Sequence, residues 1–235
     1  MTWRWLICFS LIAVRAAGAL IEGQITLRDS REASVQKKSD FSGVVVSLVP
    51  MPNGVSLEPA KHSRMVQKNK TFSPHVLAVQ AGTEVDFPNF DPIFHNAFSR
   101  YNGQPFDVGL YPPGTSRTIR FTRAGIVRVF CNIHPHMSAI IVVLNTPYFA
   151  ETGKDGRFSI DAPPGVYELH VFHERATEST LGALTRAITA GSGRLEVPPI
   201  TISEAGFLPA PHKNKYDRNY PPDADDRSLY PGVRE

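Results

Sequence analysis

Several features that define other protein classes are scarce or absent in this sequence. Only two of its 235 residues are cysteines, which is too few for a disulfide framework. Its twenty prolines are spread through short apolar runs, which argues against a helical bundle because a proline costs about 3 kcal/mol inside a helix. Beyond the N-terminal segment, no apolar run reaches the roughly 20 residues that a membrane-spanning helix needs. These absences leave an all-β protein that does not span a membrane.

The N-terminus has the pattern of a secretory signal peptide. An apolar stretch over residues 5–14 follows Arg4, and three small residues at positions 17–19 form a cleavage signature. We therefore expect residues 1–19 to be a signal peptide and the protein to be periplasmic. Cleavage also removes Arg4 and Arg15, so basic and acidic residues nearly balance. That balance excludes nucleic acid as a partner.

Cleavage leaves the mature protein with a single cysteine. Cys8 lies in the signal peptide, so Cys131 has no partner in a compartment where thiols usually pair as disulfides. An unpaired cysteine in an exported protein needs another role.

Apolar residues alternate with polar ones between glycine and proline turns, which predicts a series of short strands with the spacing of a β-sandwich. The run from Ala139 to Leu144 is continuously apolar and predicts a strand that is buried on both faces. The expected strands cover residues 21–27, 44–49, 85–87, 96–99, 118–121, 125–131, 139–144, 158–160 and 167–171, with two edge strands within 184–202.

These strands divide the mature chain into four parts. We expect an N-terminal β segment at residues 20–64, a first β-sandwich domain at 65–145 and a second small β module at 146–203. Residues 204–235 are rich in proline, tyrosine and charge and have no apolar period, so we expect a disordered tail.

Metal-binding side chains gather between the last two core strands of the first domain. Cys131, His134 and Met137 fall within seven residues, and a sandwich fold could bring His95 from an earlier strand alongside them. Two imidazoles, a thiolate and a thioether make the donor set of a blue-copper site, which is suited to one-electron transfer. The sequence therefore predicts one bound copper ion.

The sequence also contains two other histidine arrangements. His136 lies in the same loop and stays open as an alternative to His134, although Met137 would be crowded if Cys131 and His136 were the ligand pair. His170 and His173 are three apart on a predicted strand and so face opposite sides. We expect them to be surface residues and not a second metal site.

The spacing of Cys131, His134 and Met137 resembles the short ligand loop of the cupredoxins, of the amicyanin and plastocyanin type. Residues 72–74, 81–89, 95–99 and 106–109 resemble the cupredoxin proteins labelled methylamine-utilisation proteins. The resemblance extends over residues 65–145. It implies a cupredoxin Greek-key β-sandwich that holds one type 1 copper.

The cupredoxin resemblance also implies a role for each site residue. It makes His95, Cys131 and His134 the equatorial ligands and Met137 the axial ligand. Asn96 resembles the family asparagine whose side chain ties the two ligand loops together, which supports the ligands from outside.

A second resemblance concerns the small β module. Residues 151–173 resemble the carboxypeptidase-regulatory-like β-sandwich, and residues 23–29 and 44–49 resemble strands of the same module. The resemblance implies that the cupredoxin domain is inserted into this module or shares a sheet with it. The module is non-catalytic in such proteins, which implies a role in packing or partner contact.

Together these features predict an electron carrier and not an enzyme. Its partners would be redox proteins such as a cytochrome or a dehydrogenase. A copper oxidase or nitrite reductase would need a second copper centre, and Asn132, not a histidine, follows Cys131. The alternative is a periplasmic copper-binding or delivery protein without a redox partner.

Overall fold

The computed structural model describes residues 18–52, 58, 62–100, 103–208 and 212–221. Strands dominate these residues, which confirms the all-β expectation. The expected signal peptide lies outside the described residues except for Gly18 and Ala19, and Ala19 is already the first residue of a buried strand.

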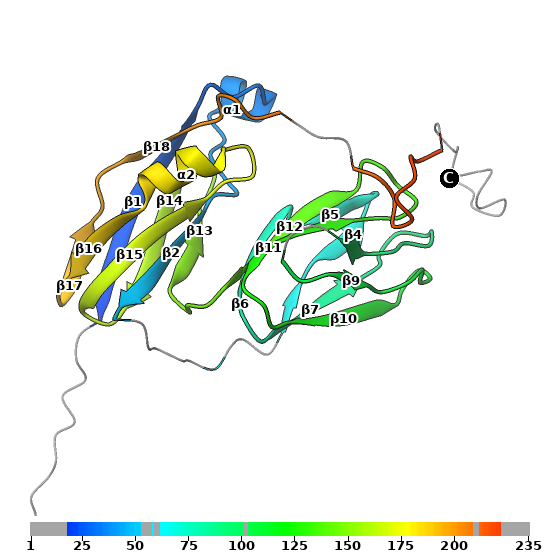
Figure 1. Cartoon of the computed structure of the whole chain (residues 1–235), viewed down its shortest axis with the longest axis horizontal. Coiled ribbons are helices and arrows are strands. Elements are labelled where there is room, and N and C mark those ends of the chain that lie inside the picture. Colours follow the sequence, from blue (N-terminus) through cyan, green and yellow to red (C-terminus); the bar gives the residue numbers. More distant parts are fainter. Residues whose placement is uncertain (1–17, 53–57, 59–61, 101–102, 209–211, 222–235) are drawn as a thin grey trace, which may run out of the picture.

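The described chain contains eighteen strands and two short helices (Figure 1). The strands are β1 (Ala19–Arg28), β2 (Val45–Met51), β3 (His62–Arg64), β4 (Val66–Lys68), β5 (Thr71–Ser73), β6 (Val76–Gln80), β7 (Thr83–Pro88), β8 (Phe98–Ser99), β9 (Phe106–Asp107), β10 (Ser116–Phe121), β11 (Gly125–Phe130), β12 (Ser138–Leu144), β13 (Phe149–Glu151), β14 (Arg157–Ala162), β15 (Gly165–Phe172), β16 (Arg186–Ala190), β17 (Gly193–Glu196) and β18 (Ile200–Ser203). The helices are α1 (Ala33–Lys38) and α2 (Glu178–Leu184).

One β-sandwich, which we call the frame module, combines strands from both halves of the chain (Figure 1). Its first sheet has the order β14-β1-β17, with β18 also paired to β1, and its second has the order β13-β2-β15-β16. Alternate residues of these strands point inward, so Ile21, Leu48 and Leu169 are fully buried in one apolar core. The first two strands of the chain therefore pair with strands that follow residue 145.

The other sandwich, which we call the inserted module, contains β3 to β12. One sheet has the order β10-β7-β3 and the other the order β6-β12-β11-β8-β9, with β4 and β5 forming a separate pair. Val85 and Phe87 of β7 alternate with polar residues and face the core, where they meet Val129 of β11. The alternation of Val85 and Phe87 in the sequence thus matches a strand with one buried face.

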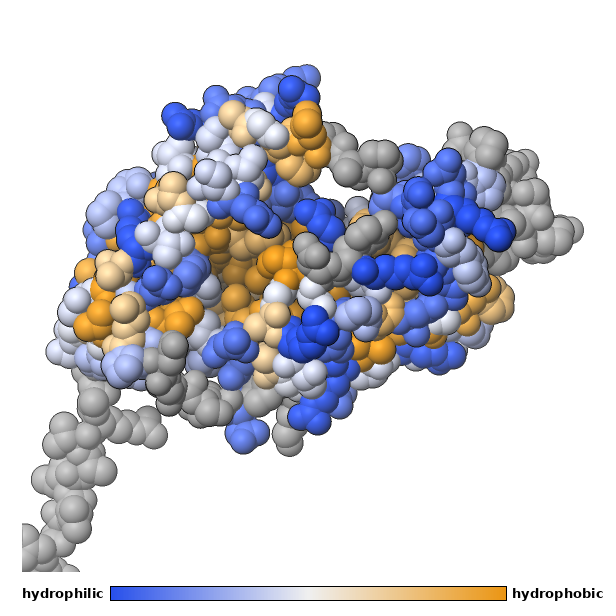
Figure 2. All heavy atoms as spheres, viewed as in Figure 1, coloured by the Kyte–Doolittle hydropathy of each residue, from blue (hydrophilic) through white to orange (hydrophobic). Residues whose placement is uncertain are grey.

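The two faces of β12 explain its continuous apolar run. Ala139, Ile141 and Val143 point into the core of the inserted module, while Ile140 and Val142 point the other way into a second apolar cluster. That cluster also contains Val45 of β2, together with Val76 and Ala78 of β6. It joins the inserted module to the frame module, and Figure 2 shows apolar residues in the hollow between the two sandwiches on the face drawn.

Both helices are short additions to the frame module that the sequence analysis does not predict. Helix α1 has six residues and lies between β1 and β2, and α2 has seven and follows β15. Thr177 caps α2, because its side chain accepts a hydrogen bond from the N–H of Thr180 at 3.2 Å. No helix in the described part of the chain is long and apolar enough to cross a membrane.

The described residues after β18 differ from the disordered tail that their composition predicts. Glu204 is buried in the frame module, and residues 212–221 return to the inserted module, where they form hydrogen bonds with its loops. The composition wrongly suggests disorder because these residues are held by polar and aromatic contacts and not by an apolar core. Their partners lie about 80 residues earlier in the sequence.

Candidate metal centre

The loop between β11 and β12 positions three of the four predicted ligands. These strands pair antiparallel up to Phe130 and Ser138, and the loop between them is closed by backbone hydrogen bonds. The N–H of Cys131 donates to the carbonyl of Met137 at 3.1 Å, and the N–H of Met137 donates to the carbonyl of His134 at 3.1 Å. The loop backbone therefore holds Cys131 and His134 in a tight turn at the end of the sheet.

A second segment brings His95 to this loop. His95 and Tyr111 exchange backbone hydrogen bonds of 3.2 and 2.9 Å, and three residues later Phe98 pairs with Phe130, next to Cys131. The sandwich topology thus joins two parts of the chain that are 36 residues apart.

Three predicted ligands converge in the interior. The sulfur of Cys131 lies 3.9 Å from Nδ1 of His95 and 3.5 Å from Nδ1 of His134, and the three ligand atoms lie within 4.8 Å of one another. All three residues are buried, with His134 7% exposed. His136, the alternative left open by the sequence, is exposed and is not part of this group. A soft thiolate and two imidazoles in one buried group form a donor set that suits copper.

Burial sets the protonation of the two imidazoles. Desolvation lowers the pKa of His134 to about 4, and it lowers the pKa of His95 although nearby Asp91 opposes that shift. Both rings are therefore neutral at pH 7, the form in which imidazole binds a metal.

The Cys131 thiol experiences opposing effects. Burial raises its pKa, whereas backbone N–H groups of Ile133, Asn96 and His134 favour the thiolate by hydrogen bonding. These N–H groups come from both ligand segments. They therefore provide hydrogen bonds for a metal-bound thiolate without further rearrangement of the chain.

Asp91 is a site residue that the sequence analysis misses. Its Oδ2 accepts a 2.7 Å hydrogen bond from Nε2 of His95, so Nδ1 of that ring faces Cys131 without a hydrogen. The N–H groups of Asn69 and Lys70 donate to Asp91 at 2.6 and 2.8 Å. A carboxylate that orients a ligand histidine is a common support of metal sites. The available signal was an aspartate four residues before His95 in the same loop.

Asn96 differs from its expected role of joining the two ligand loops through its side chain. Its Nδ2 donates to Oδ1 of Asp107 at 2.8 Å and to the carbonyl of Gly109 at 2.9 Å. The side chain therefore fixes the loop after β9. The connection to the Cys131 loop is made by the backbone N–H of Asn96.

Met137, the predicted axial ligand, is buried beside Cys131 in the core of the inserted module. Its backbone N–H and carbonyl bond to His134 and Cys131 respectively. Met137 is thus fixed at the end of the ligand loop.

Residues 212–221, which we call the C-terminal strap, contact the ligand loop (Figure 1). The ring of His212 stacks on Phe130 with a centroid separation of 4.0 Å, and its Nε2 donates to the carbonyl of Pro135 at 2.8 Å. These contacts fix the start of the strap on the end of the inserted module that contains the predicted ligands.

Two further strap residues bond to the loop. The hydroxyl of Tyr220 donates to the carbonyl of Cys131 at 2.8 Å, and the N–H of Lys215 donates to Oδ1 of Asn132 at 2.9 Å. The ammonium of Lys215 also lies 2.8 Å from a carboxylate oxygen of Asp107. The strap is therefore bonded to the ligand loop and to the loop that Asn96 fixes.

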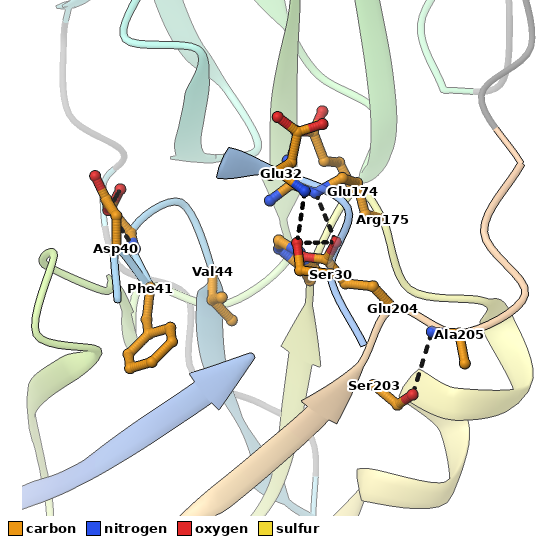
Figure 3. A network of polar contacts seen from close by, with 12 residues as sticks. Ser30, Glu32, Asp40, Phe41, Val44, Glu174, Arg175, Ser203, Glu204 and Ala205 are labelled. Atoms are coloured by element: carbon orange, nitrogen blue, oxygen red, sulfur yellow. Dashed lines mark hydrogen bonds and ion pairs between the residues drawn. The ribbon is translucent and has the colours of Figure 1, made fainter. Parts of the chain in front are cut away.

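The second histidine pair lies in the frame module. His173 is buried, not at the surface as predicted, and its Nε2 donates to Glu204 at 2.9 Å. Arg175 and Ser30 also bond to Glu204, at 3.0 and 2.7 Å, and Arg175 pairs with Glu174 at 2.8 Å (Figure 3). The prediction was wrong because His173 follows the end of β15, beyond the alternation on which it rested.

A cavity of about 320 Å³ lies beside this network, and residues of both modules line it. His75 of the inserted module bonds to Glu174 at 2.9 Å across the junction. His170 is partly exposed and pairs with Glu168 at 2.7 Å, so it takes no part in the network.

No family model and no curated protein matches this sequence, but solved structures do. The copper-containing nitrite reductase of Thermus scotoductus SA-01 is 29% identical, with a TM-score of 0.35, and the match covers 40% of this chain and 24% of the reductase. A purple cupredoxin from Nitrosopumilus maritimus is 23% identical, with a TM-score of 0.32, over 35% of this chain and 99% of its own. A reduced amicyanin mutant is 18% identical, with a TM-score of 0.34, over 42% of this chain and 92% of its own. Each match covers less than half of this chain.

Proposed function

We propose that the protein is an exported, mononuclear type 1 copper protein of the cupredoxin kind, which transfers single electrons between redox partners in the periplasm. The convergence of His95, Cys131 and His134 in one buried group carries this proposal. The two imidazoles are neutral at pH 7, and backbone N–H groups support the thiolate.

Each residue has a distinct part in this function. His95 and His134 would hold the copper through Nδ1 and Cys131 through its sulfur, and Met137 would supply a thioether as the fourth ligand. Bound copper supplies a one-electron couple. The closed backbone turn and the Asp91 hydrogen bond keep the donors in place, so little has to reorganise when the charge changes.

We propose a carrier and not a copper enzyme, because Asn132 takes the position after Cys131 where a bridging histidine would lead to a second copper centre. In this proposal, residues 65–145 form the copper domain together with β3, which pairs with β7, and the rest of residues 20–64 and residues 146–203 supply a non-catalytic frame. The pairing of β1 with β14 and of β2 with β15 supports that division.

The test is reversible redox cycling of the purified, copper-loaded protein. Ascorbate should bleach a visible thiolate-to-copper band and ferricyanide should restore it, over repeated cycles and with one electron per protein. If the protein instead binds Cu(I) tightly, releases it readily to a chelator and exchanges no electrons with cytochromes, the delivery alternative replaces this proposal.

A further inference from the structure

The C-terminal strap covers part of the end of the inserted module where the predicted ligands lie. Through Tyr220 and His212 it bonds to the carbonyls of Cys131 and Pro135, on either side of His134 in the sequence. His134 itself is buried. A partner that approaches the ligand loop from this side therefore meets the strap.

The outer side of the strap is basic and aromatic. Lys213, Tyr216 and Arg218 are exposed, and Tyr216 is 63% exposed. Asp217 is the only acidic residue of the strap and pairs with Lys213 at 3.4 Å, and Lys215 pairs with Asp107 at 2.8 Å. Three basic residues against these two carboxylates leave a net positive charge. The ammonium of Lys215 lies 5.4 Å from the centre of the Tyr216 ring.

Lys70 adds positive charge to the same end of the molecule. It follows Asn69 in the turn between β4 and β5, and its N–H donates to Asp91. Its charge is close enough to act on both His95 and His134. The positive charge thus extends from the strap to the region around the predicted ligands.

We infer that the outer face of the strap, with Lys70, is the docking surface for a redox partner that presents a carboxylate-rich patch. This inference rests on the proposed function. Opposite charges raise the encounter rate and orient the two proteins, and the exposed Tyr216 supplies an apolar contact. The hydrogen bond from Tyr220 to Cys131 then connects this surface directly to the backbone of the thiolate ligand.

Small redox reagents of opposite charge test the inference without a known partner. The reduced, copper-loaded full chain is mixed with ferricyanide or with tris(phenanthroline)cobalt(III). In each reaction the protein loses one electron, and Fe(III) becomes Fe(II) or Co(III) becomes Co(II). For the double variant Lys213→Glu/Arg218→Glu, the rate constant with ferricyanide should fall about tenfold at low ionic strength, and that with the cobalt complex should rise. Both changes in rate constant should vanish at about 0.5 M salt, because the ions screen the charges.

Two further variants control for unrelated effects. Lys37→Glu/Lys38→Glu makes the same change in net charge on exposed residues of α1, in the frame module, and should leave both rate constants nearly unchanged. Lys213→Gln/Arg218→Gln removes the charges without reversing them and should give an intermediate result. It keeps the test valid if the glutamates disturb the strap.

A second readout does not depend on copper. Hexacyanochromate(III), a paramagnetic trianion, should broaden the backbone amide signals of strap residues 213–218 and of Lys70 in the metal-free protein. The double glutamate variant should lose this broadening.

The outcomes separate the two proposals. A blue protein whose rate constants are the same in wild type and strap variants, or whose broadened amides lie elsewhere, overturns the docking surface and leaves the proposed function intact. A protein with no thiolate-to-copper band and no electron exchange overturns the proposed function, and the docking inference falls with it.

Discussion

At the residue scale, Asp91 is expected to adjust the electronic properties of the site. Its carboxylate accepts the 2.7 Å hydrogen bond from His95, and the negative charge favours the more positive oxidation state of a bound metal. Asp91→Asn keeps the size and removes the charge. We predict that the reduction potential rises by about 60 mV, which corresponds to ~1.4 kcal/mol for one electron.

A spectroelectrochemical titration measures this potential. Asp86→Asn is the matched control, because Asp86 is an acidic residue of β7 that pairs with His62 and not with a ligand. An unchanged potential in Asp91→Asn, or an equal rise in the control, would contradict the role of Asp91.

The two histidines of the ligand loop should behave differently. His134 faces Cys131 from a buried position, whereas His136 is exposed. We predict that His134→Ala loses the visible thiolate-to-copper band and that His136→Ala keeps it, as seen in absorption spectra of the Cu(II)-loaded variants. The reverse pattern would make His136 the ligand.

The sequence predicts part of this site and misses the rest for a clear reason. Cys131, His134 and Met137 can be found because three kinds of metal donor lie in one short loop. His95 can be assigned to the same site once the fold is expected to be a sandwich. Asp91 has no distinctive type or spacing, because aspartates are common in turns for other reasons.

At the scale of elements, the network around Glu204 joins the chain after β18 to the end of β15 and to Ser30. Burial opposes ionisation of Glu204, but hydrogen bonds from Arg175, Ser30 and His173 outweigh it and hold its pKa below the ordinary 4.5. Because the pKa is lower in the folded state, the stabilisation is present above about pH 4.5 and is lost as the pH falls through the folded-state pKa.

We therefore predict that Glu204→Gln lowers the free energy of unfolding by about 3 kcal/mol at pH 7, since it removes the buried carboxylate that accepts from Arg175, and Arg175 then keeps only its pair with Glu174. Urea denaturation at several pH values measures the effect, and the difference from wild type should shrink below pH 4.5. Glu168→Gln, which breaks the more exposed pair with His170, should cost less than about 1 kcal/mol. Equal costs for both variants, or a cost that does not depend on pH, would argue against a stabilising network.

The strands are predicted well where apolar residues follow a regular pattern in the sequence. The expected strands 118–121, 125–131 and 139–144 differ by only one or two residues at an end from β10, β11 and β12. Helices α1 and α2 are missed because six or seven residues are too few for a clear helical period. The C-terminal strap is missed because its contacts involve polar and aromatic groups that are distant in the sequence.

At the scale of the whole molecule, the apolar cluster between the modules should make them unfold together. Ile140 and Val142 of the inserted module meet Val45 of the frame module in this cluster. Both connections of the inserted module also lead into frame strands, since β2 precedes it and β13 follows it. The resemblance to the carboxypeptidase-regulatory-like module implies either an insertion or a sheet shared by the two modules. No sheet among the described residues contains strands of both modules, which agrees with an insertion.

We predict that Ile140→Ala destabilises the protein by about 3 kcal/mol, as expected for a large-to-small change at a buried site. Hydrogen–deuterium exchange should show faster global opening in both modules, because the cluster couples them. Exchange that accelerates in the inserted module alone would show that the modules unfold independently.

The proposed copper site depends on the thiolate of Cys131, and the visible absorption and EPR spectra of the Cu(II)-loaded mature protein beside those of Cys131→Ala test it. We predict an intense thiolate-to-copper band and a narrow copper hyperfine splitting in the wild type, both absent in the variant. A colourless wild-type protein, or copper binding that is the same in Cys131→Ala, would contradict the proposed type 1 copper site.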